Sequence, residues 1–84
     1  SITLNNSQPE VQYNLGNVYY DLQSFEKARD AYLKAIEIVP RYFDALNNLG
    51  NVYYYLNQTG EAEKAYLEAA AAQPGSPLRN MLML

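Results

Sequence analysis

Apolar residues recur every three to four positions along most of the chain, which is the period of one face of an α-helix. The pattern predicts helices at 8–22, 25–39, 43–56 and 60–73, and a fifth helix from Pro77 to Leu84. The expected core face of the first helix is Val11, Leu15, Val18, Tyr19 and Leu22. That of the second helix is Ala28, Ala31, Tyr32, Ala35, Ile36 and Val39.

The same pattern occurs twice, at a distance of 34 residues. The segment Asn14–Tyr20 (NLGNVYY) returns unchanged as Asn48–Tyr54, and Pro40 is matched by Pro74. A fixed period of this length indicates a stacked array of repeats rather than one globular core. We therefore expect residues 1–84 to form a single domain. Repeat one is expected at 9–42, repeat two at 43–76, and a truncated third repeat or capping helix at 77–84.

Gly16 and Gly50 lie in the middle of predicted helices, where glycine costs up to about 1 kcal/mol relative to alanine. We expect this position to lack a side chain because the two helices of each pair pack closely there. Ala28 and Ala62 are the small residues expected to face the two glycines. A phosphate-binding loop is the alternative, but each glycine stands alone and no Lys-Ser or Lys-Thr pair follows it.

These positions resemble the pattern of the tetratricopeptide repeat (TPR) family. The matching residues are Leu15, Gly16, Tyr19, Ala28, Tyr32, Ala35 and Pro40, and then Leu49, Gly50, Tyr53, Ala62, Tyr66, Ala69 and Pro74. The resemblance implies an all-α fold, in which antiparallel helix pairs form a right-handed superhelix. The sequence departs from the family pattern at Gln23 and Asn57, where glycine is frequent, and at Thr59, where an aromatic residue is frequent.

The resemblance also implies a non-catalytic module whose first helices line a concave groove for an extended peptide of a partner protein. The groove is expected to contain Glu10, Tyr13, Asn14, Asn17, Tyr20, Asp21, Asp44, Asn47, Asn48, Asn51, Tyr54 and Tyr55. Asparagine can both donate to and accept from a peptide unit, and tyrosine adds contact area at a low cost in entropy. The carboxylates in this set favour a neutral or basic partner over an acidic one.

The C-terminal residues suggest an alternative function, that of a structural assembly element. Leu78, Met81, Leu82, Met83 and Leu84 form an apolar end, whereas a solenoid normally ends in a helix with a polar outer face. One interpretation is that these residues mediate self-association into a homo-oligomer. The other is that a third repeat would cover them.

Composition excludes several classes of function. The chain has no His and no Cys, so we expect no metal and no cofactor, and no nucleophile has a base at a workable spacing for an enzyme. The net charge of −3 argues against nucleic acid. No apolar run is long enough to span a membrane and no signal peptide is visible, so we expect an intracellular, cytoplasmic protein. Because the chain begins with Ser and enters its repeats almost at once, we expect it to be part of a longer protein.

Overall fold

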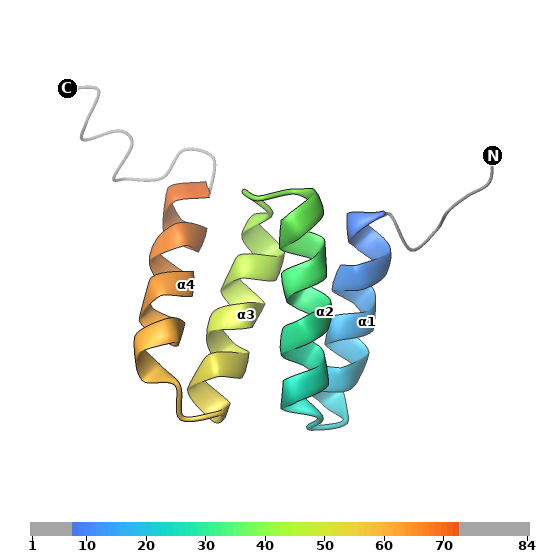
Figure 1. Ribbon diagram of the computed structural model, residues 1–84, viewed down its shortest axis with the longest axis horizontal. Helices are drawn as coiled ribbons and strands as arrows, with labels where there is room; N and C mark the ends of the chain where they lie inside the picture. Colours follow the sequence, from blue (N-terminus) through green and yellow to red (C-terminus); the bar gives the residue numbers. More distant parts are fainter. Residues whose placement is uncertain (1–7, 73–84) are drawn as a thin grey trace.

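The computed structural model describes residues 8–72, and the predicted helix at 77–84 and the apolar C-terminal residues lie outside this part. The described residues form four α-helices, which are α1 (Pro9–Asp21), α2 (Phe25–Ile38), α3 (Phe43–Tyr55) and α4 (Thr59–Ala72). The helices run alternately in opposite directions, and each packs against the one before it (Figure 1). Each lies within one residue of its predicted range at either end. The predicted all-α fold of consecutive antiparallel helix pairs is therefore confirmed.

The core lies where α2 packs against its neighbours, and it is built from small residues around one large ring. Its central members are Ala28, Tyr32 and Ala35 from α2, Ala45, Leu49 and Val52 from α3, and Ala65 from α4. The alanines allow the helices to approach closely, while Tyr32 and Val52 are the largest fully buried side chains. Fully burying a side chain the size of valine or leucine stabilises the fold by about 1.5–3 kcal/mol.

The predicted core face of the first helix is wrong at four of its five residues, whereas the fifth, Tyr19, is half-buried and packs against the core. Val11, Leu15, Val18 and Leu22 are 38–68% exposed, and the buried residues of α1 are instead Gln12 and Gly16. The apolar period identifies residues that share a face, but burial also needs a neighbouring element on that face. The face of α3 that corresponds to it is covered by α2, whereas the helices within residues 8–72 flank α1 on one side only (Figure 1).

The expected partner of the helical glycines also needs correction. A Cβ atom added at Gly16 would lie 2.6 Å from the ring of Tyr32, and one added at Gly50 would lie 2.5 Å from the ring of Tyr66. The close approach within each helix pair is therefore present, but the glycine accommodates a tyrosine ring from the second helix rather than the small side chain of Ala28 or Ala62.

Arg41 connects the loop between α2 and α3 to the end of the last described helix. Its Nη2 donates a hydrogen bond of 2.8 Å to the carbonyl oxygen of Ala71. The last carbonyl groups of a helix have no partner within the helix and carry partial negative charge, so a guanidinium there is favourable.

Candidate functional site

A network of hydrogen bonds joins the first three helices on the surface that the sequence predicts to be the groove. Tyr32 of α2 donates its hydroxyl hydrogen to Oδ1 of Asn17 on α1, at 2.5 Å. Nδ2 of Asn48, on α3, lies 3.1 Å from the same Asn17 oxygen and 3.4 Å from the hydroxyl oxygens of Tyr32 and Tyr13. These four side chains therefore hold the first and third helices in register through one buried tyrosine.

The buried phenol of Tyr32 remains a hydrogen-bond donor far into the alkaline range. Burial raises the pKa of Tyr32 to about 12, although the hydrogen bond from Asn48 acts in the opposite direction. Burial disfavours the charged form of any acid, so the neutral phenol that Asn17 requires is the form present at neutral pH.

The same arrangement begins again 34 residues later. The hydroxyl group of Tyr66 donates to Oδ1 of Asn51, as that of Tyr32 does to Asn17. In both helix pairs, adjacent Gly and Asn residues on the first helix thus contact a tyrosine of the second helix. The glycine leaves space for the ring, and the asparagine side chain accepts a hydrogen bond from the tyrosine hydroxyl group. Part of the repeated sequence is therefore explained by packing within each helix pair.

A cavity of 460 Å³ opens next to this network. Its lining consists of Asn17, Tyr20, Asp21, Tyr32, Asn48 and Asn51. Five of these six residues belong to the predicted groove, and they come from both α1 and α3. The lining offers amide and phenol groups, which can both donate and accept hydrogen bonds, together with one carboxylate.

Aromatic rings continue the groove surface toward the lower ends of α1 and α3 in Figure 1. The rings of Phe25 and Tyr55 are stacked, with centroids 4.8 Å apart, and Tyr20 meets both of them edge-on. Tyr55 and Tyr54 are 55% and 62% exposed. Pairs of this geometry are worth about 0.5–1.5 kcal/mol beyond area burial, so the cluster forms a fixed aromatic surface that remains open to solvent.

Carboxylates are the only charged groups on the two helices that form this surface. Glu10 and Asp21 lie on α1 and Asp44 lies on α3, and neither helix contains Lys or Arg. At the upper end, burial and the charges of Glu10 and Asp44 raise the pKa of Tyr42. The ring of Tyr42 lies 5.4 Å from that of Tyr13. All charged side chains of α1 and α3 are therefore acidic, and one of them, Asp21, lines the cavity.

The structure brings the predicted groove residues together only in part. Asn17, Tyr20, Asn48 and Asn51 share the cavity, Tyr13 joins their network, and Tyr54 lies in the aromatic cluster. Glu10, Asn14 and Asp44 are exposed and Asn47 is half-buried, and none of these four lines the cavity.

Three residues of this surface are missing from the predicted groove. The sequence predicts Tyr32 only in the core, and Phe25 and Tyr42 are not among the predicted groove residues. For Phe25 and Tyr42, the sequence does contain a signal, because both are aromatic residues next to a turn. A ring in such a place can contact the neighbouring helix. For Tyr32, the apolar spacing predicts only that the ring is buried. It does not indicate that the hydroxyl group bonds to Asn17.

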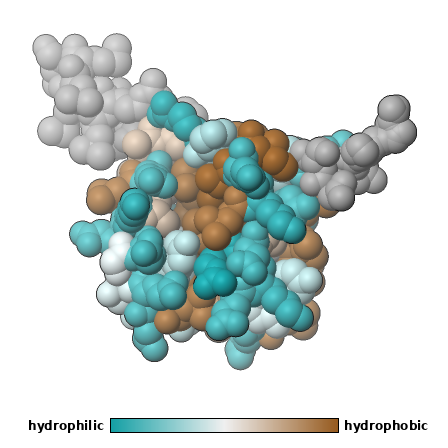
Figure 2. Space-filling view, in the orientation of Figure 1, coloured by the Kyte–Doolittle hydropathy of each residue, from teal (hydrophilic) through white to brown (hydrophobic). Residues whose placement is uncertain are grey.

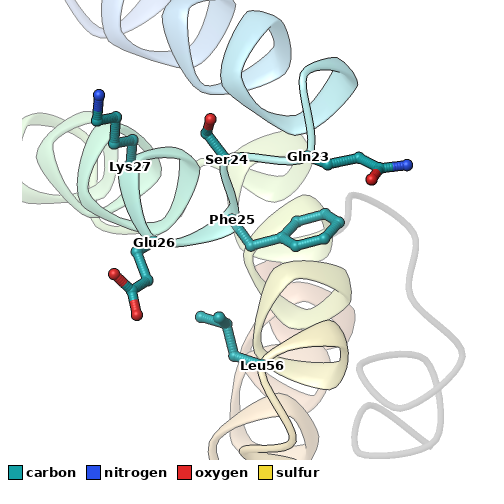
Figure 3. A pocket seen from close by; sticks show the side chains of 6 residues that line it. All are labelled: Gln23, Ser24, Phe25, Glu26, Lys27 and Leu56. Carbon is teal, nitrogen blue, oxygen red and sulfur yellow. The ribbon is translucent and has the colours of Figure 1, made fainter.

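A second cavity, of 370 Å³, lies at the turn between α1 and α2. It is lined by Gln23, Ser24, Phe25, Glu26, Lys27 and Leu56. The charged side chains of Glu26 and Lys27 point away from each other and do not converge on a common point (Figure 3). The first cavity is therefore the better candidate site.

The outer surface formed by α2 and α4 has a different character. Figure 2 shows many hydrophilic side chains on the face that it draws, with a hydrophobic band between them. The charged residues of α2 include the adjacent ion pair of Arg29 and Asp30 at 3.2 Å. Within residues 8–72, no group of His, Cys, Asp and Glu side chains could hold a metal ion. Across the same residues, no helix has the length and apolar character needed to cross a membrane.

Helix pairs of alternating direction, with the same glycine–tyrosine–asparagine packing in each pair, define a helical repeat protein of the solenoid class. Comparison with protein families identifies the particular repeat. A family model described as "TPR repeat" matches residues 16–57, and another, described as "Tetratricopeptide repeat", matches residues 43–76. The chain belongs to the tetratricopeptide repeat family, whose repeats generally mediate protein–protein interactions. No curated protein matches the chain.

Proposed function

We propose that this chain is a non-catalytic interaction module that binds an extended peptide segment of a partner protein on the surface formed by α1 and α3. The observation that supports this proposal most directly is the cavity of 460 Å³, which is lined by amides, phenols and the carboxylate of Asp21. The absence of Lys and Arg from α1 and α3 supports a neutral or basic peptide. An acidic peptide would meet three carboxylates there without a compensating cation.

The proposed peptide lies along the groove, with its backbone against the amides and its side chains against the aromatic cluster. Asn51 and Asn47 supply donors and acceptors on α3, while Tyr54 and Tyr55 provide exposed ring faces. Ring faces attract a Lys or Arg side chain in addition to apolar ones. The internal network of Asn17, Tyr32 and Asn48 fixes the geometry of this surface.

The test measures binding of fluorescent peptides that share one neutral scaffold and carry Lys, Gln or Glu at the same positions. We expect the Lys peptide to bind best and the Glu peptide to bind worst. The change Asp21→Asn should weaken the Lys peptide about two- to fivefold, which is typical of one exposed ion pair.

Glu68→Gln is the matched control. Glu68 lines a crevice with Leu33, Lys64 and Ala65, outside the proposed groove, and its neutralisation changes the net charge by the same amount as Asp21→Asn. Equal effects of both substitutions would mean that only net charge matters, and stronger binding of the Glu peptide would contradict the proposal.

A further inference from the structure

The exposed apolar face of α1 has a buried counterpart within the same chain. Leu15 is 40% exposed whereas Leu49, 34 residues later, is 4% exposed, and Val18 is 52% exposed whereas Val52 is fully buried. The α3 face is covered because α2 packs on it. Hydrophobic atoms are visible along the edge of the molecule that α1 forms (Figure 2). The apolar residues on this face of α1 could therefore pack against a helix like α2. Within the described residues, no helix packs there.

The opposite end of the array has the complementary feature. Tyr66 of α4 is 37% exposed although its counterpart Tyr32 is fully buried. Ala70 takes the place of Ile36, and both are half-buried. Ala62 and Ala69 are 3% and 2% exposed in one copy, so they do not belong to the open face of α4. That face contains Tyr66 and Ala70, which repeat Tyr32 and Ile36 of α2, where α3 packs.

Polar groups at the two ends match as well. Asn48 reaches from α3 to the Asn17 oxygen and the Tyr32 hydroxyl group. Asn14, which occupies the place of Asn48 on α1, is exposed. The pair that corresponds to Asn17 and Tyr32 at the other end is Asn51 and Tyr66, joined by the same type of hydrogen bond.

We propose that α1 of one copy of this chain docks on α4 of a second copy, so that the junction between copies reproduces the junction between α2 and α3. Val11, Leu15, Val18 and Leu22 of one copy then cover Tyr66 and Ala70 of the other. Nδ2 of Asn14 donates to the Asn51 oxygen and the Tyr66 hydroxyl group across the junction. This assembly goes beyond the proposed function, because it joins the two ends of the array, although it shares Asn51 with the lining of the cavity.

The sequence indicates why a second copy suits the α4 face better than the chain's own residues 77–84. Continuing the period places Arg79 where the fully buried Ala45 lies, and Leu82 where Asn48 lies. A buried unpaired guanidinium is strongly unfavourable, and leucine cannot donate to Asn51. The α1 helix instead offers Val11 and Asn14 at these two places.

The proposed contact is heterologous, because different surfaces of the two copies meet. Such a contact does not close after two copies unless the rotation permits it, so association continues to longer species as concentration rises. Each copy carries a net charge of −3, and added salt screens their repulsion. We therefore expect association to strengthen with ionic strength.

The test is sedimentation equilibrium of the full chain at concentrations up to about 1 mM, where even weak interfaces are populated. We expect the average mass of the unchanged chain to rise above the 9.5 kDa of one copy. Leu15→Glu and Ala70→Glu should each weaken association at least about tenfold, because each would bury an unpaired carboxylate in the junction. Val18→Glu replaces Leu15→Glu if circular dichroism shows that the latter does not fold.

Leu33→Glu is the matched control, since Leu33 is also 40% exposed but lies on the central helix α2, where it lines a crevice with Leu49 and Tyr53. It should associate as the unchanged chain does. Mixing Leu15→Glu with Ala70→Glu should give a 1:1 dimer that neither variant forms alone, because one intact junction remains.

Three results would overturn the proposal. One is a monomeric chain at every concentration. Another is a mixture of Leu15→Glu and Ala70→Glu that stays monomeric. The third is association that survives both of these variants and is lost in Leu82→Glu, which would assign it to the C-terminal residues. None of these outcomes bears on peptide binding, which is measured on the monomeric Leu15→Glu variant.

Discussion

Gly16 and Gly50 occupy the same place in the two helix pairs but face rings with different freedom to move. The ring of Tyr32, against Gly16, is fully buried, whereas that of Tyr66, against Gly50, is 37% exposed. A buried ring surrounded by packed atoms cannot shift without displacing them. A ring at the surface can move toward solvent, so the same added methyl group has different consequences at the two sites.

We therefore expect Gly16→Ala to destabilise the protein by about 1–2 kcal/mol, since overpacking typically costs about 1–3 kcal/mol and the helix preference of alanine returns up to about 1 kcal/mol. Gly50→Ala should stay within about 0.5 kcal/mol of the unchanged chain, because the shift of Tyr66 offsets much of the clash. The measurement is the free energy of unfolding in urea.

Gly60→Ala provides the reference for this pair of substitutions, because a Cβ atom at Gly60 would meet nothing within 4 Å. The change in stability of Gly60→Ala therefore measures the helix preference of alanine alone, without a clash between the added methyl group and a neighbouring side chain. Equal losses of stability in Gly16→Ala and Gly50→Ala would show that the exposure of the facing ring is not what matters.

Among the elements, the two turns within the helix pairs share one conformation. Gln23 and Asn57 have φ angles of 62° and 64°. The N–H groups of Gln23 and Ser24 bond to the carbonyl oxygens of Tyr20 and Tyr19, and the second turn repeats this pattern. This is the Schellman arrangement, in which the left-handed residue allows the last carbonyls of the helix to be satisfied. Glycine adopts that conformation without a steric penalty, whereas glutamine does not.

Gln23→Gly should therefore stabilise the protein by about 0.5–1 kcal/mol, while Asn57→Gly should change stability by less, because asparagine tolerates the left-handed region better than glutamine. Thermal unfolding of the two variants beside the unchanged chain measures this difference. A loss of stability in Gln23→Gly would mean that the glutamine side chain makes a compensating contact, and Gln23→Ala would then lose at least as much.

The apolar period, together with proline and turn residues, was sufficient to predict the four described helices, because helix formation depends on local sequence. It did not predict which faces are buried. Val18 and Val52 have identical neighbours in sequence, yet one is half exposed and the other fully buried. That difference arises from the packing of α2, which the local sequence of α1 does not encode. Part of the cavity lining could be predicted from the sequence. The hydrogen bond between Tyr32 and Asn17 could not, because it depends on how α1 and α2 cross, which the apolar period does not encode.

In the molecule as a whole, each described helix packs mainly against its neighbours along the array, and this determines how stability is distributed. The two central helices, α2 and α3, pack on both sides, whereas α1 and α4 pack on one side (Figure 1). In such a one-dimensional system the stability is a sum of repeat and junction terms, and a helix with one junction opens more easily. The buried ring of Tyr32 and the network of Asn17 and Asn48 strengthen the central junction further.

Hydrogen exchange should therefore be slowest in α2 and α3 and faster in α1 and α4, when it is measured at a concentration low enough to keep the copies apart. The reason is that local opening of an end helix breaks one junction, while opening of a central helix breaks two. Uniform exchange across all four helices would mean that the array unfolds as a single cooperative unit. When the concentration is raised, protection should increase in the amides of α1 and α4 and stay constant in Leu15→Glu, because the added junction between copies covers the two faces that are exposed in one copy.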